Sequence, residues 1–246
     1  MGRSTPRRDA RRARGAVGCG ASGAGLQPTE HRPGPSPSEH HPKKKALRAQ
    51  EREREAVIEE RAAFLEWLKT VDPERLWVLD EAGSHIAMTP IYGRSRRGQR
   101  LAESVPRNRG TVTTLFGALN LRGMTALMTI LGGTSGPVFV MYIERMLCPL
   151  LQPGDIVILD NLAAHKVNAV RELVEARGAS LKFLPPYSPD LSPIEEAWSK
   201  VKHIMRALKP RNAAQLNEAF LRGANSITAR DAAAYFKHCG YKTQPS

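Results

Sequence analysis

The chain has 246 residues, of which 41% are hydrophobic, and its 37 Lys and Arg against 24 Asp and Glu give a formal net charge of +13. This length allows one or two domains with a sizeable core, and no apolar stretch approaches the roughly 18 residues that a membrane-spanning helix needs. Three cysteines without a Cys-x-x-Cys pair argue against a disulfide framework and a thiolate zinc site. Motifs for P-loop hydrolysis, dinucleotide binding, zinc proteolysis and serine hydrolysis are missing as well.

The N-terminal segment is basic and rich in Gly and Pro. Residues 1–50 hold 11 Lys and Arg but only 3 Asp and Glu, and residues 1–42 contain 7 Gly and 6 Pro. Large apolar residues are few there, so little burial would offset the entropy lost on ordering. We therefore predict that residues 1–42 are disordered.

The rest of the chain alternates between helical and strand-like patterns. A helix is predicted from about Ala46 to Lys69, with an apolar stripe formed by Val57, Phe64, Leu65, Leu68 and the aliphatic stem of Arg61. Predicted strands follow at Leu76–Leu79, His85–Tyr92, Thr111–Leu121, Ala126–Leu131, Asp155–Leu159 and Ser180–Leu184. Further helices are predicted at Val138–Leu150, Lys166–Ala176, Ile194–Leu208, Ala213–Ser226 and Ala229–His238. This order predicts an α/β fold, with a mixed sheet flanked by helices.

Two of the predicted strands run directly into carboxylates. Leu76–Leu79 is followed by Asp80, and Asp155–Leu159 is followed by Asp160. Open α/β sheets bind ligands at strand ends, so two such carboxylates can converge. Close carboxylates repel each other unless a cation lies between them, and Mg²⁺ suits one or two carboxylates together with substrate phosphate. Each Asp taken alone could equally well begin an ordinary turn.

A third acid opens a predicted helix. The apolar face of that helix repeats at helical spacing and consists of Ile194, Ala197, Trp198, Val201, Ile204, Met205 and Leu208. Glu195 lies off this face, in line with Lys202 and Arg206, which suits a metal ligand beside a phosphate backbone. The sequence Ser192-Pro193-Ile194-Glu195 also fits a capping box, in which Glu195 reaches back to the Ser192 amide. On these four residues alone, the capping box is favoured.

Taken together, three stretches resemble a known family. They are Leu79-Asp80-Glu81-Ala82-Gly83, Leu159-Asp160-Asn161-Leu162-Ala163-Ala164-His165 and Pro185-Pro186-Tyr187-Ser188-Pro189-Asp190-Leu191-Ser192-Pro193-Ile194-Glu195-Glu196-Ala197-Trp198. They resemble the Asp-Asp-Glu triad of the mariner-like superfamily of transposases (DDE superfamily endonucleases), and its bacterial insertion-sequence branch most closely. The resemblance implies an RNase H-like catalytic domain over residues 76–246, preceded by a linker helix over residues 43–75.

The resemblance also implies an activity and its residues. Asp80, Asp160 and Glu195 match the family's catalytic, metal-binding acids, which would hold two Mg²⁺ or Mn²⁺ ions for phosphodiester hydrolysis and strand transfer at transposon ends. The expected partners are double-stranded DNA with a TA target and a second copy in a homodimer, at a cytoplasmic, nucleoid-associated location and without a membrane. Family members carry helix-turn-helix modules before the catalytic domain, and residues 1–42 lack their periodicity. We therefore expect a catalytic half, which a helix-turn-helix protein from an upstream frame could complete.

Basic residues supply candidate DNA contacts. Six arginines lie within 16 residues between Gly93 and Gly110, and they predict a phosphate-gripping loop: Arg94, Arg96, Arg97, Arg100, Arg107 and Arg109. A solvated turn is the alternative, and the net charge favours DNA. Lys200, Lys202, Lys209 and Arg211 form a second candidate group. The resemblance implies a supporting or DNA-contacting role for His165, although an ordinary histidine at a helix start fits equally well. Trp67, Trp77 and Trp198 are predicted to pack in the core.

Two other functions compete with an active transposase. One is a catalytically silent remnant that binds DNA through charge or inhibits an intact transposase. The intact triad argues against it, whereas the missing N-terminal modules argue for it. The other is a host RNase H-type nuclease or resolvase, which the run Ser-Pro-Asp-Leu-Ser-Pro-Ile-Glu disfavours.

Overall fold

The computed structural model describes residues 49–161 and 168–243. By its internal contacts the chain divides into two units, Met1–Ala46 and Leu47–Ser246, and every described residue belongs to the second unit. The disorder predicted for residues 1–42 and the candidate contact His165 both lie outside the described residues.

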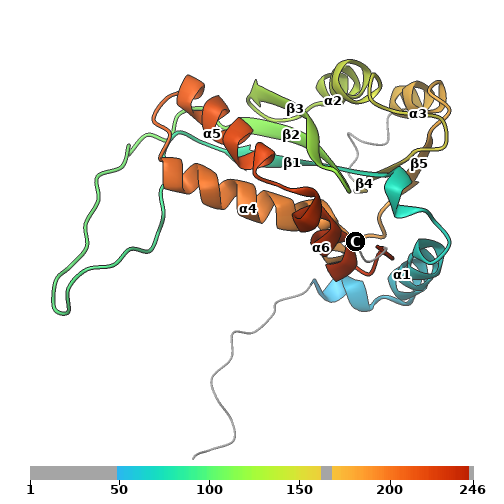
Figure 1. The fold of residues 1–246 in the computed structure, drawn as a ribbon, viewed down its shortest axis with the longest axis horizontal. Helices are drawn as coiled ribbons and strands as arrows, with labels where there is room; N and C mark the ends of the chain where they lie inside the picture. The colour runs from blue at the N-terminus through green and yellow to red at the C-terminus, as the bar shows by residue number, and fades with distance from the viewer. Residues whose placement is uncertain (1–48, 162–167, 244–246) are drawn as a thin grey trace, which may run out of the picture. The chain divides into compact units, whose positions relative to one another are not determined.

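A five-stranded mixed sheet forms the centre of the second unit (Figure 1). Its strands are β1 (Leu76–Ser84), β2 (Thr113–Asn120), β3 (Gly123–Leu131), β4 (Ile156–Leu159) and β5 (Ser180–Phe183), in the order β3-β2-β1-β4-β5. The first three strands pair antiparallel, whereas β4 pairs parallel with both β1 and β5. The predicted mixed sheet is therefore confirmed.

Helices cover both faces of this sheet (Figure 1). One core contains residues of α1 (Glu55–Leu68), α4 (Pro193–Leu208), α5 (Ala213–Asn225) and α6 (Ala229–His238), and the other contains residues of α2 (Gly136–Tyr142), η3 (Ile143–Leu147) and α3 (Asn168–Glu175). Side chains alternate along a strand, so neighbours in sequence enter different cores. Val78 belongs to the core with α4, and Leu79 belongs to the core with α2.

One predicted strand is wrong. The described residues His85–Tyr92 form turns and irregular backbone, because the pairing of β1 with β2 ends at Ser84 opposite Thr113 and leaves them without a neighbouring strand. The apolar side chains of Ile91 and Tyr92 are 83% and 87% exposed, so their pattern reflects no burial. The helix predicted over Val138–Leu150 also ends early, because its α-helical part stops at Tyr142 and a π-helical turn continues to Leu147.

Close packing sets the position of α4 on the sheet. A Cβ atom added to Gly117 of β2 would lie 2.8 Å from Met124 Cε and 3.3 Å from Trp198 Cη2, so the indole packs closely over the backbone of this glycine. Trp198 is buried and stacks on Phe220 of α5, with 6.0 Å between ring centroids. The core position predicted for Trp198 is confirmed, and α4 is held over the strand position that pairs with Asp80.

The helices of the described segments include none with the length and apolar character needed to cross a membrane.

Candidate active site

The strand register brings two of the predicted acids side by side. β1 and β4 pair parallel with Val78 beside Ile158, and continuing this register by two residues places Asp80 beside Asp160. Both positions then share the face of Val78 and Ile158, which belong to the core with α4. Asp80 lies within β1 rather than at its end, because the antiparallel pairing with β2 extends this strand to Ser84.

The third acid comes from the start of α4. In the described structure Ser192 caps α4 without a side-chain hydrogen bond, and its amide donates instead to the Pro189 carbonyl at 3.0 Å. The capping box is therefore not formed, and its prediction from these four residues is wrong. Glu195 is exposed in the first turn of the helix.

A pocket of about 550 Å³ is lined by all three carboxylates, from Asp80, Asp160 and Glu195. The remaining lining residues are Leu79, Asn161, Leu184, Pro185, Pro186, Tyr187, Ser188, Pro189 and Ser192. Most of them belong to the segment between β5 and α4, so this segment and the strand ends together form the wall. The fold thus gathers three acids that are 35 to 115 positions apart in sequence.

The carboxylates share this pocket without forming a closed ligand set. Across residues 49–161 and 168–243, no three His, Cys, Asp or Glu side chains lie close enough together to hold a metal ion. Their charges nevertheless interact. Burial, followed by the negative charge of Glu195, raises the pKa of Asp80 to about 7; the charges of Glu81 and Asp160 add to this rise, whereas a hydrogen bond with the Glu81 backbone opposes it. A hard divalent cation relieves such repulsion and prefers oxygen ligands, so this donor set suits Mg²⁺ or Mn²⁺.

The raised pKa of Asp80 predicts a pH-dependent stability for the metal-free protein. An unfolded Asp titrates near 3.9, so between about pH 4 and pH 7 the folded state binds more protons than the unfolded state. The free energy of unfolding should therefore fall as the pH rises through this window, by on the order of 2 kcal/mol. This is less than the whole pKa shift implies, because solvent at the pocket screens part of the cost of charging Asp80. Thermal unfolding in EDTA at pH 5 and pH 8 measures this, and Asp80→Asn should remove most of the difference. An equal pH dependence in wild type and Asp80→Asn would contradict the electrostatic origin.

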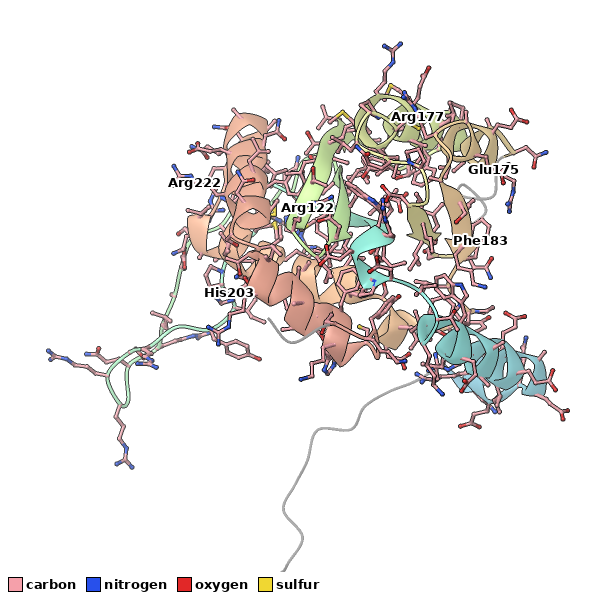
Figure 2. The ribbon with its side chains drawn as sticks, turned by 45° about the vertical axis from the view of Figure 1, so that its right-hand side comes forward. Arg122, Glu175, Arg177, Phe183, His203 and Arg222 are labelled. Carbon is pink, nitrogen blue, oxygen red and sulfur yellow. The ribbon has the colours of Figure 1, made fainter. Side chains whose placement is uncertain are left out.

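The six candidate arginines lie in a long irregular segment between β1 and β2, and all of them are exposed. Figure 2 shows side chains with nitrogen tips projecting from this segment in several directions. At its base, Lys209 pairs with Glu103 at 2.6 Å, and Arg211 donates to the carbonyls of Ile86 and Met88. Lys209 follows α4, about 20 Å along the helix from Glu195 at 1.5 Å per residue. The base of the arginine segment is therefore remote from the carboxylate pocket.

The second group of candidate cations is mostly engaged within the protein. Lys200 donates to the Ser226 carbonyl and to Asp231 Oδ2, both at 2.9 Å, and so links α4 to α6. Lys209 and Arg211 hold the base of the arginine segment, whereas Lys202 is half-buried on α4. A DNA contact by Lys200 would have to compete with its ion pair.

Sequence reasoning missed two features beside the pocket. Tyr187 lines it with a φ of 54°, a left-handed conformation that bulky residues rarely adopt. Arg61, interpreted from the sequence as a stem in an apolar stripe, directs its guanidinium at Ser188 and Asp190. Helical periodicity carried no information about the partner of Arg61.

Comparisons with known proteins agree with this architecture. Residues 75–217 match the family of DDE superfamily endonucleases, and this range includes all three acids. A comparison with curated protein sequences finds no match.

Solved structures of Mos1 transposase share the fold. The Mos1 mariner paired end complex with Mn is similar with a TM-score of 0.65 and 16% identity, over 85% of this chain and 69% of that chain. The Mos1 strand transfer complex gives a TM-score of 0.63 and 17% identity, over 82% of this chain and 62% of that chain. The Mos1 transposase catalytic domain with Raltegravir and Mn is covered completely, by 81% of this chain, with a TM-score of 0.58 and 15% identity. The chain therefore belongs to the DDE superfamily endonucleases, and its fold is the RNase H-like fold of the Mos1 catalytic domain.

Proposed function

We propose that this protein is a DNA transposase that hydrolyses phosphodiester bonds and transfers strands at transposon ends, with Asp80, Asp160 and Glu195 as its catalytic, metal-binding residues. The observation that supports this most strongly is the shared pocket of the three acids, in a chain of the endonuclease family. The solved relatives include a paired end complex with Mn and a strand transfer complex, which fits the same chemistry.

The carboxylates would hold two Mg²⁺ or Mn²⁺ ions. Divalent cations bound there would polarise phosphate oxygens and make a water molecule or a 3′-hydroxyl a stronger nucleophile. The charges of Glu195 and Asp160 both raise the pKa of Asp80, so a cation held by these three residues would relieve that repulsion. Drawing the three acids together needs the cation charge, because they repel one another without it.

DNA would extend well beyond this pocket. Lys209, which pairs with Glu103 of the arginine segment, lies about 20 Å along α4 from Glu195, so the six guanidinium groups of this segment would contact phosphates away from the cleaved bond. A TA target, a homodimer, a helix-turn-helix partner and a cytoplasmic, nucleoid-associated location belong to the same proposal.

Glu195→Gln tests the assignment of the third acid. Glutamine keeps the size of the side chain but removes the charge, so Mg²⁺-dependent nicking of DNA should fall at least about 100-fold. Stability should stay within about 0.5 kcal/mol, because no capping box is lost. The adjacent Glu196→Gln is a matched control on the same helical turn and should retain nicking. Equal activity of the two variants would remove Glu195 from the site.

One second candidate is the silent DNA-binding remnant, for which the exposed arginines between β1 and β2 would supply the phosphate contacts. It would bind DNA with a strong salt dependence but would not nick it at any Mg²⁺ or Mn²⁺ concentration. Nicking by the wild-type chain that EDTA abolishes would exclude this candidate.

A further inference from the structure

Arg61 of α1 forms hydrogen bonds with the segment between β5 and α4, which forms one wall of the pocket. Arg61 donates from Nη1 to Ser188 Oγ at 2.5 Å and to Asp190 Oδ1 at 3.2 Å, and from Nη2 to Asp190 Oδ2 at 2.9 Å. Its side chain is only 13% exposed. Arg52 adds a second bond to Asp190 Oδ2 at 2.9 Å. A paired arginine–carboxylate fork fixes orientation as well as distance, which a single ion pair does not.

The segment that Arg61 holds contains Tyr187, which lines the pocket with a strained backbone conformation. Ser188 receives the bond from Arg61 and donates its own hydroxyl to the Pro186 carbonyl at 2.9 Å, so these bonds bracket Tyr187. The left-handed backbone of Tyr187 is strained and persists only where the surroundings impose it. The bonds from Arg61 and Ser188 supply that restraint.

The same segment leads directly into Glu195. Ser192 has no side-chain cap bond in the described structure, and Leu191 is held through its carbonyl by Tyr241 Oη at 2.9 Å. The start of α4 is thus placed by tertiary contacts to the segment before it rather than by a local cap. Burial acts to raise the pKa of Asp190, but the bonds from Arg61 and Arg52 outweigh it and lower that pKa, so the fork persists in mild acid.

We propose that Arg61 is a positioning residue, which holds the Pro185–Ser192 segment so that Glu195 and Tyr187 face Asp80 and Asp160 across the pocket. The inference rests on the proposed metal-dependent function of that pocket. An ordinary surface ion pair contributes little and affects stability alone. A positioning residue also changes how the pocket binds metal and how fast it reacts, because a 1 Å displacement can lower a rate about 100-fold.

The test compares Arg61→Gln with Arg61→Lys and with Asp231→Asn. Asp231 caps α6 and pairs with Lys200, so its variant loses comparable polar contacts at a site that does not line the pocket. Three quantities are measured on the full chain: Mn²⁺ affinity by calorimetry without DNA, kcat and KM for DNA nicking, and thermal unfolding.

For Arg61→Gln we expect kcat to fall at least about tenfold and the Mn²⁺ dissociation constant to rise several-fold, with KM for DNA within twofold of wild type. For Arg61→Lys we expect values of kcat and of the Mn²⁺ dissociation constant between those of wild type and Arg61→Gln, since lysine reaches one oxygen but cannot form the fork. Asp231→Asn should lower the unfolding temperature without changing Mn²⁺ affinity.

Unchanged Mn²⁺ affinity and kcat in Arg61→Gln would overturn the proposal and leave an ordinary ion pair, whereas a raised KM alone would make Arg61 a DNA contact. If Arg61→Gln does not fold, Asp190→Asn, which weakens the fork from the other side, is judged by the same criteria. Wild-type protein that binds Mn²⁺ but never nicks DNA would refute the proposed function, and the Mn²⁺ affinities would still decide the role of Arg61.

Discussion

Asp160→Asn should abolish Mg²⁺-dependent nicking, with a loss of at least about 1000-fold, while the protein remains folded and binds DNA. Asp160 directly follows β4 and lies beside Asp80 in the pocket, so it would contribute a ligand oxygen to the cations. Asparagine keeps one side-chain oxygen but loses the negative charge, which removes several kcal/mol of charge stabilisation in the transition state, and each 1.4 kcal/mol is a factor of ten. Nicking of a supercoiled plasmid over a range of Mg²⁺ concentrations measures the effect.

Stability and DNA binding serve as the controls for this variant. Asp160 is among the charges that raise the pKa of Asp80, so its neutralisation should leave the unfolding temperature equal to or slightly above that of wild type. Glu172→Gln, on the exposed face of α3, should behave as wild type in every assay. Nicking by Asp160→Asn at more than a tenth of the wild-type rate would remove Asp160 from the catalytic set.

Trp198→Ala should destabilise the protein by about 3–5 kcal/mol and lower the unfolding temperature by about 10 °C. The indole is buried between Gly117 of β2 and Phe220 of α5, so truncation leaves a cavity beneath α4. Because the first turn of α4 carries Glu195, nicking should fall as well, even at temperatures where the variant is folded. Calorimetry gives the stability, and the plasmid assay gives the activity.

Trp198→Phe is the conservative partner of that variant. It keeps an aromatic ring and removes an indole Nε1 that is buried without a hydrogen-bond partner among the described residues. We therefore expect a loss below about 1.5 kcal/mol and near-normal nicking. A Trp198→Ala protein as stable as wild type would show that α4 is held on the sheet by other contacts.

The helices and strands that the sequence predicts best are those with strong, uninterrupted periodicity. α6 has its predicted bounds, and α4 and α5 differ from theirs by one residue at one end, because each presents one apolar face to the core. The strand predicted at His85–Tyr92 failed because β-propensity does not show whether a neighbouring strand is available for pairing. β1 is longer than its apolar stretch because a neighbouring strand is available there: its pairing with β2 continues past Asp80 to Ser84.

The sequence likewise predicts some residues of the candidate site and misses others. The sequence identified Asp80, Asp160 and Glu195 through their positions after apolar strands and within a motif, and the fold brings them to one pocket. The local sequence favoured a capping box at Ser192. It does not form, because the Ser192 amide donates its hydrogen bond to the Pro189 carbonyl instead. The fork between Arg61 and Asp190 joins residues 129 positions apart, and no helical or strand period encodes such a contact. Long-range polar partners were thus beyond prediction from periodicity.

The most direct measurement is a crystal structure of the protein with Mn²⁺ and a DNA end, with the metal located by its anomalous scattering. We predict a Mn²⁺ peak within coordination distance of the carboxylate oxygens of Asp80 and Asp160, with Glu195 drawn toward the same cluster. A structure at saturating Mn²⁺ in which these acids stay apart and the metal binds elsewhere, or nowhere, would contradict the proposal that they form one catalytic centre.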